Sequence, residues 1–403
     1  MSQPRQVVLA YSGGLDTSFC IKHLSLEKGY EVHALTVNTG GFSPEELKAL
    51  EQKALDLGAA SYRAVDALPA YYQQCIRYLI FGNVLRNNTY PLSVSAERMF
   101  QALETVKYAN EIGAQAVAHG STGAGNDQVR FDLVFEILGN DLEIITPIRD
   151  LQLSRQAEIE FLEKHGVNWP WEKAQYSINQ GIWGTSVGGA ETLTSHQALP
   201  EQAYPSQLTA EGPLDLTLHF EKGELTGING AKASHPVAAI QALQEIAAPF
   251  AIGRDTHVGD TIIGIKGRVG FEAAAPLLII KAHHLLEKHT LTKWQQYWKE
   301  QLANWYGMLL HEGQLLEPVM RNIERFLEDT QSTVTGKVFL RLHPYRFELL
   351  GIESGYDLMN SGFGQYGEMN KAWSGQDVKG FTKILSNALK IQHFVSQKNE
   401  QDD

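Results

Sequence analysis

The sequence predicts an α/β fold, in which a doubly wound parallel sheet is followed by a second, α+β domain and a C-terminal helix. Strand and helix patterns alternate over residues 6–165, as they do in folds built from strand–helix–strand units. Glycine also ends three of the predicted helices, and a strand pattern begins within a few residues of each. This arrangement is typical of the short connections in parallel sheets.

The elements of the first half follow from local patterns. Runs rich in apolar and β-branched residues predict five strands: Gln6–Tyr11, Glu31–Val37, Ser61–Val65, Gln115–His119 and Leu142–Thr146. Between them, four helices are predicted at Leu15–Glu27, from Pro44 to Gly58, at Ala96–Ile112 and at Gln128–Leu138. The second helix has the clearest beginning, because Ser43 and Glu46 can form a capping box around Pro44.

The pattern changes after Gly166, and Trp169-Pro170-Trp171 lies at the boundary. Beyond it we expect two hairpins and two helices, at residues 214–229, 334–352, Val237–Ile246 and Leu277–Leu309. An amphipathic last helix is predicted by the spacing of Phe381, Ile384, Leu385, Ala388 and Leu389. Its apolar stripe could cover its own domain, but we expect it to pack on another subunit. The expected divisions are residues 1–168, 169–365 and 366–403.

The composition limits the class of protein. The 403 residues carry 34 Lys and Arg against 46 Asp and Glu, a formal charge of −12. This balance argues against a nucleic-acid partner, because phosphate backbones attract basic surfaces. No apolar run approaches the roughly 18 residues of a membrane span. Cys20 and Cys75 are the only cysteines, so we expect a reducing, cytoplasmic location and neither a disulfide framework nor a zinc site.

The segment Ala10–Ser18 joins the first strand to the first helix and reads Ala-Tyr-Ser-Gly-Gly-Leu-Asp-Thr-Ser. Its two glycines let the backbone turn sharply and approach a ligand closely. The first N–H groups of the helix then face outward with the positive end of the helix dipole, and three hydroxyl groups add donors. The segment lacks the Gly-Lys-Ser/Thr of the Walker loop. It therefore predicts an anion cradle suited to pyrophosphate.

A second glycine-rich loop, within His119–Arg130, also joins a strand to a helix. It carries an amide, a carboxylate and a guanidinium at Asn126, Asp127 and Arg130. Asn126 and Arg130 are four residues apart and share one helix face. Arg130 can bind a carboxylate through two parallel hydrogen bonds, and Asp127 can hold an ammonium group. The loop therefore predicts an amino-acid site.

Together the two loops resemble a known family. The first resembles the SGGxDS/T loop of the ATP pyrophosphatases, which cleave ATP between its α- and β-phosphates. With His-Gly-Ser-Thr-Gly-x-Gly-Asn-Asp-Gln-Val-Arg in the second loop, the chain resembles the argininosuccinate synthase family, firmly over residues 6–165 and more loosely to about residue 395. The resemblance implies an adenine-nucleotide alpha-hydrolase-like fold, a synthetase domain after residue 168 and a homotetramer.

The same resemblance implies a ligase of arginine biosynthesis. The ureido oxygen of citrulline would attack the α-phosphate of ATP, bound with Mg²⁺, to give citrullyl-adenylate and pyrophosphate. The aspartate amine would then displace AMP. Beyond the Mg²⁺ that accompanies ATP, no metal site is expected.

The resemblance further implies roles for particular residues. Those expected to bind ATP are Ala10, Tyr11, Ser12, Gly13, Gly14, Leu15, Asp16, Thr17, Ser18, Val37 and Gly120. Those expected to bind aspartate are Thr122, Asn126 and Asp127, and those expected to bind citrulline are Tyr90, Ser95, Asn126, Arg130, Ser177, Ser186 and Phe271. The expected catalytic residues are Asp16, Asn126 and Asp127. Ser95 has a second interpretation as a helix cap, because it precedes the predicted helix Ala96–Ile112.

Two family contacts to citrulline are changed. Gly259 and Phe271 stand where the family has Glu and Tyr, so the carboxylate that would pair with the α-ammonium group of citrulline is missing, and an unpaired buried charge is strongly unfavourable. Three explanations stay open. Asp255 or Asp260 supplies the charge, the alignment is offset by one residue, or the acceptor is an Nα-acylated citrulline. Plain citrulline is the primary expectation.

Other functions fit the sequence less well. Other amide-forming ATP pyrophosphatases carry or recruit an ammonia source, and this chain has no glutaminase-type N-terminal Cys. The tRNA-thiolating members need reactive cysteines and a basic surface. A nucleotide sensor without catalysis would not need Asn126, Asp127 and Arg130.

Overall fold

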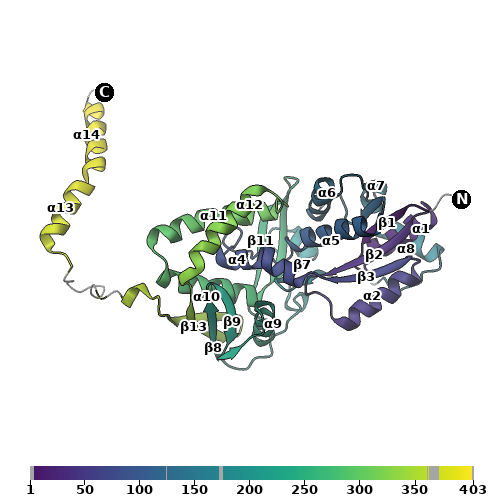
Figure 1. Cartoon of the computed structure of the whole chain (residues 1–403), viewed down its shortest axis with the longest axis horizontal. Helices are drawn as coiled ribbons and strands as arrows, with labels where there is room; N and C mark the ends of the chain where they lie inside the picture. Colours follow the sequence, from purple (N-terminus) through teal and green to yellow (C-terminus); the bar gives the residue numbers. More distant parts are fainter. Residues whose placement is uncertain (1–3, 124, 172–175, 361, 363–371, 402–403) are drawn as a thin grey trace. The chain divides into compact units, whose positions relative to one another are not determined.

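The computed structural model describes residues 4–123, 125–171, 176–360, 362 and 372–401 (Figure 1). The chain divides into two compact units, Met1–Tyr356 and Asp357–Asp403. The predicted boundary after residue 168 lies inside the first unit. The predicted boundary between residues 365 and 366 lies outside the described residues.

The N-terminal half is built on a five-stranded parallel sheet with the order β3-β2-β1-β4-β5. Its strands are β1 (Gln6–Ala10), β2 (Glu31–Asn38), β3 (Ser61–Asp66), β4 (Ala116–His119) and β5 (Glu143–Ile145). The five predicted strands and the α/β class are confirmed. The central strand β1 is apolar at successive positions because both of its faces are covered, and Val7, Val8 and Leu9 are 0% exposed.

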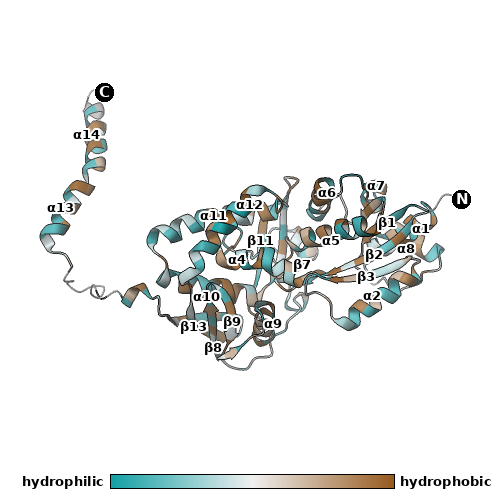
Figure 2. Ribbon diagram, in the orientation of Figure 1, coloured by the Kyte–Doolittle hydropathy of each residue, from teal (hydrophilic) through white to brown (hydrophobic). Residues whose placement is uncertain are grey.

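Helices cover both faces of this sheet (Figures 1 and 2). On one face, α1 (Leu15–Leu26) and α8 (Arg155–Lys164) pack in the core that includes Val7 and Leu9. On the other, α5 (Glu97–Ile112) and α6 (Asp127–Leu138) pack in the core that includes Val8. The chain thus leaves β1 toward one face and β4 toward the other. Ligands bind at such a switch point in doubly wound sheets, and both glycine-rich loops lie there.

The remainder of the first unit contains two antiparallel sheets, with the orders β10-β9-β8-β13-β14 and β11-β12-β7-β6. The strands are β6 (Ser177–Gly181), β7 (Gly184–Gly188), β8 (Leu214–Glu221), β9 (Glu224–Ile228), β10 (Ala231–Lys232), β11 (Arg254–Asp260), β12 (Lys266–Glu272), β13 (Gly336–His343) and β14 (Arg346–Glu353). The predicted hairpins are confirmed as β8–β9 and β13–β14. The pairs β6–β7 and β11–β12 have no counterpart among the predictions.

The predicted single helix at Leu277–Leu309 is wrong, because the chain forms two helices there, α10 (Ala274–Thr290) and α11 (Lys293–His311). Thr292 begins α11 with a capping box, in which its backbone N–H donates to Gln295 Oε1 at 3.0 Å. The other helices of this unit are α2 (Pro44–Asp56), α3 (Leu68–Tyr71), α4 (Arg77–Phe81), α7 (Pro147–Leu151), α9 (Pro236–Ala247) and α12 (Pro318–Asp329). Of these, α2 starts at the predicted capping box.

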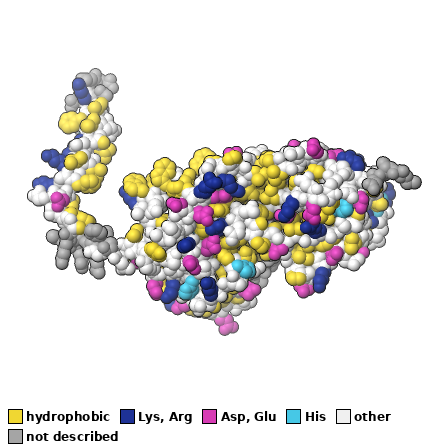
Figure 3. All heavy atoms as spheres, viewed as in Figure 1, with side chains coloured by type: hydrophobic (Ala, Val, Ile, Leu, Met, Phe, Trp, Pro, Cys, Tyr) yellow, Lys and Arg dark blue, Asp and Glu magenta, His cyan; other side chains and the backbone are white. Residues whose placement is uncertain are grey.

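In the described part of the second unit the α-helices are α13 (Gly375–Leu385) and α14 (Asn387–Gln401), where one helix was predicted. Apolar side chains are visible along them in Figure 3. Phe381 is 64%, Ile384 72% and Leu389 71% exposed, so the helices of this unit do not cover the predicted stripe themselves. None of the helices in the described part of the chain combines the length and apolar character needed to span a bilayer.

A buried ionic network joins α10 to α11. Glu287 and Lys299 are both buried, and Lys299 Nζ lies 2.8 Å from Glu287 Oε2. Lys299 also donates to the Phe81 carbonyl at 2.7 Å, and Gln331 donates to Glu287 Oε1 at 3.0 Å. Charges this deep are tolerated because each has a partner.

Lys299→Met is therefore expected to lower the free energy of unfolding by about 3–5 kcal/mol, because it leaves the Glu287 carboxylate buried without its cation. Urea or thermal unfolding measures the change. The double variant Lys299→Met/Glu287→Gln should recover much of the loss. A double variant no more stable than the single one would contradict this account of the pair.

Candidate active site

A cavity of about 1000 Å³ lies at the switch point between β1 and β4, where the first sheet faces β6, β7, β11 and β12. Most of the predicted site residues lie on its wall: Ala10, Tyr11, Ser12, Gly14, Leu15, Asp16, Thr17, Val37, Tyr90, Ser95, Gly120, Thr122, Asn126, Asp127, Arg130, Ser177 and Ser186. Gly13, Ser18 and Phe271 are not on the wall. Ser18 and Phe271 are 0% exposed, so they lie behind it.

The first loop leads into α1, whose N-cap residue, Gly14, provides no capping side chain. The N–H groups of the first turn are therefore available to an anion, together with the positive end of the dipole. Gly13 has a φ of +76°, in the left-handed region that favours glycine, and a β-carbon there would also press on the Leu50 side chain. The hydroxyls of Ser12 and Thr17 lie 3.3 Å apart. This geometry suits a polyphosphate.

The two glycine-rich loops touch each other at Gly120. A β-carbon on Gly120 would lie 3.1 Å from Thr17 Cγ2 and 3.3 Å from Thr17 N. His119 fixes the start of the second loop, since its ring Nδ1 accepts from the Ser121 N–H at 3.1 Å and its Nε2 bonds to Asp132 at 3.0 Å. The anion cradle and the amino-acid loop therefore share one continuous cavity.

Two arginines hold Asp127 at the start of α6. Arg98 Nε lies 2.9 Å from Asp127 Oδ2, and Arg130 Nη1 lies 3.1 Å from Asp127 Oδ1. Burial alone would raise the pKa of Asp127, but the two guanidinium groups lower it below its ordinary value. Arg130 also donates to the His311 carbonyl at 2.9 Å. Part of the predicted carboxylate-binding fork of Arg130 is thus used by the protein itself.

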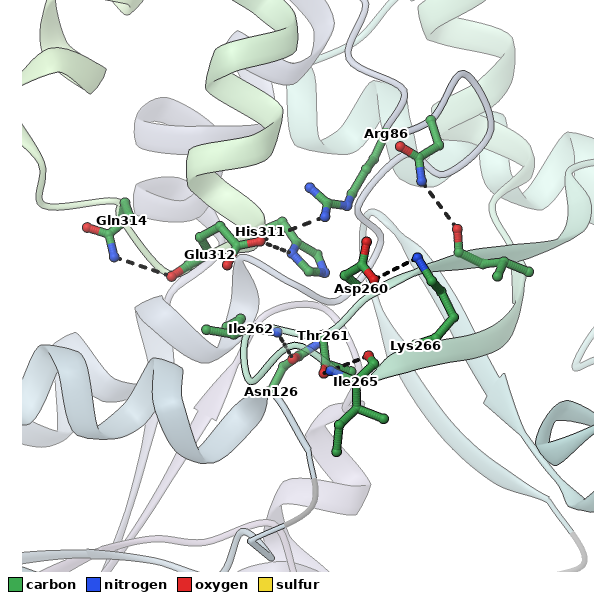
Figure 4. A network of polar contacts seen from close by, with 12 residues as sticks. Arg86, Asn126, Asp260, Thr261, Ile262, Ile265, Lys266, His311, Glu312 and Gln314 are labelled. Carbon is green, nitrogen blue, oxygen red and sulfur yellow. Dashed lines mark hydrogen bonds and ion pairs between the residues drawn. The ribbon is translucent and has the colours of Figure 1, made fainter.

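The β11–β12 hairpin closes the cavity from the second half of the chain (Figure 4). At its tip, the Ile262 N–H donates to Asn126 Oδ1 at 2.8 Å. Gly259 is paired with Gly267, and Asp260 is ion-paired with Lys266 at 2.6 Å. Gly259 and Asp260 are on the cavity wall, and Asp255 is not. Of the two residues considered for the missing charge, Asp260 therefore lies on the cavity wall, with its carboxylate paired to Lys266.

Two histidines that the sequence did not single out lie on the cavity wall: His257 on β11 of this hairpin and His311 at the end of α11. His257 stacks on Tyr90 with ring centroids 5.0 Å apart, and Phe271 packs against Tyr90 at 5.3 Å. Burial, and then the nearby Arg86, lower the pKa of His257. Burial, followed by Arg130 and Arg86, lowers the pKa of His311 to about 3. Both imidazoles on this part of the wall are therefore neutral near pH 7.

Ser95 does not cap the helix that follows it. The helix α5 begins after Ala96, which makes no side-chain capping bond. Ser95 is instead buried on the cavity wall. The alternative interpretation of Ser95 as a cap is wrong.

Glu97 is another wall residue that the sequence did not single out. It is 1% exposed, and its Oε1 has no hydrogen-bond partner. A β-carbon at Gly181 would lie 1.7 Å from this oxygen, so the carboxyl occupies space that only glycine leaves. Burial raises the pKa of Glu97 to about 8, against the opposing effect of Arg98. No local motif marks Glu97, because its burial comes from the distant strand β6.

Two family matches together cover most of the chain. The Arginosuccinate synthase N-terminal HUP domain matches residues 6–168, and the Arginosuccinate synthase C-terminal domain matches residues 176–393. The chain belongs to the argininosuccinate synthase family. It is therefore an ATP-using enzyme of the ligase class.

Relatives of nearly the same length are named argininosuccinate synthase. The chain is 35% identical to that of Xanthomonas campestris pv. campestris over 394 residues, covering 94% of this chain and 96% of the relative. It is 37% identical to that of Methanocaldococcus jannaschii over 360 residues, covering 88% and 90%. For Dictyoglomus thermophilum the identity is 36% over 383 residues, covering 94% and 95%. These names do not favour an Nα-acylated acceptor.

The buried Glu97 gives the enzyme a pH-dependent stability. The folded state holds the Glu97 proton with a pKa of about 8, against an ordinary value of 4.5. The stability linked to this proton is therefore fully present below pH 4.5 and is lost as the pH rises through 8. Glu97→Gln removes this titration. The free energy of unfolding of the variant should therefore rise relative to that of the parent protein over this pH range, by roughly 4 kcal/mol at the upper end.

Melting temperatures of the variant and the parent protein from pH 5 to 9 measure this difference in stability. Glu136→Gln, at an exposed position on α6, is the matched control and should show no such trend. If Glu97→Gln and the parent protein lose stability in parallel as the pH rises, the assignment of Glu97 as a buried acid is wrong.

Proposed function

We propose that this enzyme joins citrulline and aspartate into argininosuccinate while ATP is cleaved to AMP and pyrophosphate. The observation that carries the proposal is the close approach of Gly120 to Thr17. It places the anion cradle next to the loop that bears Asn126 and Asp127, within one cavity. Adenylation needs two substrates held in line and charge stabilised on the leaving pyrophosphate. It needs no side-chain nucleophile.

The reaction has two steps. The ureido oxygen of citrulline attacks the α-phosphorus of ATP, and the bond from that phosphorus to the oxygen of pyrophosphate breaks. The amine of aspartate then attacks the activated ureido carbon, the carbon–oxygen bond to AMP breaks, and the nitrogen loses a proton.

The ATP end of the cavity uses the first loop in this proposal. The N–H groups at the start of α1 and the hydroxyls of Ser12 and Thr17 face the phosphates and stabilise the leaving pyrophosphate. ATP enters with Mg²⁺, which proteins bind through a carboxylate together with phosphate oxygens. Asp16 offers such a carboxylate on the same wall.

The amino-acid end uses the second loop and the second half of the chain. Aspartate is held by Thr122, Asn126 and Asp127. Citrulline contacts Tyr90, Ser95, Asn126, Arg130, Ser177 and Ser186, all on the wall. Phe271 acts indirectly in this arrangement, by packing behind the Tyr90 ring. Plain citrulline is the acceptor proposed.

Pyrophosphate release from MgATP tests the proposal. Citrulline alone should give at most one equivalent per active site, because the adenylate cannot turn over, whereas citrulline with aspartate should give continuous release. Asn126→Ala should lower kcat/KM by about 100-fold, with binding of MgATP retained. Continuous release without aspartate, or no release with both amino acids, would contradict the proposed reaction.

We also infer that the enzyme is a cytoplasmic homotetramer held together by α13 and α14. Both cysteines are free and buried, which suits a reducing compartment. Large exposed apolar side chains lie along the two helices: Val378, Phe381, Ile384, Leu385, Leu389, Ile391, Phe394 and Val395. So much apolar surface is unfavourable in water, and identical subunits are its expected cover.

Light scattering should therefore give four times the chain mass of 44.8 kDa. The variant Ile384→Glu/Leu389→Glu should give smaller species, because it places charges in an apolar interface. Gln376→Glu, at an exposed polar position on α13, is the control and should remain tetrameric. A tetramer that survives both glutamates would show that these helices do not hold the assembly together.

A further inference from the structure

Lys53 supports the first loop from behind. Its side chain extends from α2, and its Nζ donates a hydrogen bond to the Gly13 carbonyl at 2.6 Å. Gly14 lines the cavity, whereas Gly13 and Lys53 lie outside its wall. Because the peptide unit is planar, with its C=O and N–H pointing in opposite directions, a Gly13 carbonyl held toward Lys53 turns the Gly14 N–H away from Lys53. Because Gly14 is on the cavity wall and Lys53 is not, we take this direction to be toward the cavity.

Two tryptophans hold the ammonium group of Lys53. Its Nζ lies 4.9 Å from the ring centroids of both Trp169 and Trp171. Cation–π contacts of this kind compensate a half-buried ammonium group for lost water. Lys53 is half-buried, and this burial lowers the pKa of its ammonium group. The Trp-Pro-Trp sequence at the boundary between the two halves thus has a structural partner in α2.

The same helix touches the loop at a second point. Leu50, three residues before Lys53, fills the space beside Gly13, where a β-carbon would come within 2.1 Å of it. Residues three apart lie on one face of a helix. Leu50 therefore limits the position of Gly13, and Lys53 fixes the orientation of its carbonyl.

We propose that Lys53, held between Trp169 and Trp171, is a positioning residue for ATP that orients the Gly13–Gly14 peptide so that its N–H faces the triphosphate. The inference rests on the proposed use of this loop for ATP and goes beyond it, because Lys53 itself touches no substrate. The ammonium charge also adds to the positive potential behind the cradle.

Lys53→Met tests the inference, because it keeps the aliphatic stem and removes the hydrogen bond and the charge. We expect the KM and the Kd for MgATP to rise roughly 10- to 100-fold. The KM values for citrulline and aspartate should stay within about twofold, because those sites lie away from Lys53. A merely structural defect would move all of these constants together. Lys48→Met, at an exposed position on the same helix, is the matched control and should change none of them.

A second variant, Trp169→Leu/Trp171→Leu, removes the aromatic clamp and leaves Lys53 in place. It should also raise the Kd for MgATP, by a smaller factor than Lys53→Met. If the melting curve shows that Lys53→Met does not fold, the Trp169→Leu/Trp171→Leu variant tests the positioning role of Lys53 in its place. An unchanged Kd in the tryptophan variant would then overturn the inference.

The variant Ser12→Ala/Thr17→Val separates failure of the inference from failure of the proposed function. If it weakens MgATP binding while a folded Lys53→Met does not, Lys53 is not a positioning residue, and the proposed ATP site stands. If neither variant weakens MgATP binding, the first loop is not the ATP site, and both proposals fall.

Discussion

The close approach of two loops at Gly120 is the constraint around which the site is arranged. The strand order β3-β2-β1-β4-β5 puts the carboxyl ends of β1 and β4 side by side, and no side chain separates the loops that follow them. A bulkier residue at Gly120 would press on the backbone and side chain of Thr17. The parallel sheet therefore contributes more than a scaffold, because its strand order determines which two loops can share a ligand.

The second half of the chain completes the cavity and fixes its charges. Asp127 is paired with Arg98 and Arg130, and Arg130 is held in turn by the His311 carbonyl at the end of α11. The cavity thus contains strong charges that are already oriented before any substrate arrives. Preorganised charge of this kind is what an adenylation reaction requires, since the protein need not rearrange as negative charge moves to the leaving group.

The sequence was sufficient to predict those parts of the structure that depend on residues close together in the chain. The five parallel strands, the capping box of α2 and the two glycine-rich loops could all be predicted, because their signals lie within a few residues of one another. The β11–β12 hairpin could not be predicted, since no turn motif marks it. His257, which lies on this hairpin, was therefore missed as well. Glu97 and Lys53 were missed for a related reason. Their environments are made by Gly181 and by Trp169 and Trp171, which are far away in the chain.

The break between α10 and α11 shows a further limit of reading helices from sequence. Apolar residues recur at helical spacing through residues 277–309, which predicts one continuous helix. The capping box at Thr292 nevertheless begins a new helix within this stretch. The cavity brings most of the predicted site residues together, and the family resemblance predicts which substrate each of them contacts.

The hairpin tip has a consequence for how this enzyme can change over evolutionary time. Ile262 holds Asn126 through a main-chain N–H, and every residue except proline can supply that donor. The side chain of Ile262 can thus be exchanged without releasing the amide of Asn126, whereas Thr261 is held by its hydroxyl, which bonds to both the N–H and the carbonyl of Ile265. The hairpin can therefore change in shape and charge at position 262, whereas Gly120, against which Thr17 packs, cannot be enlarged.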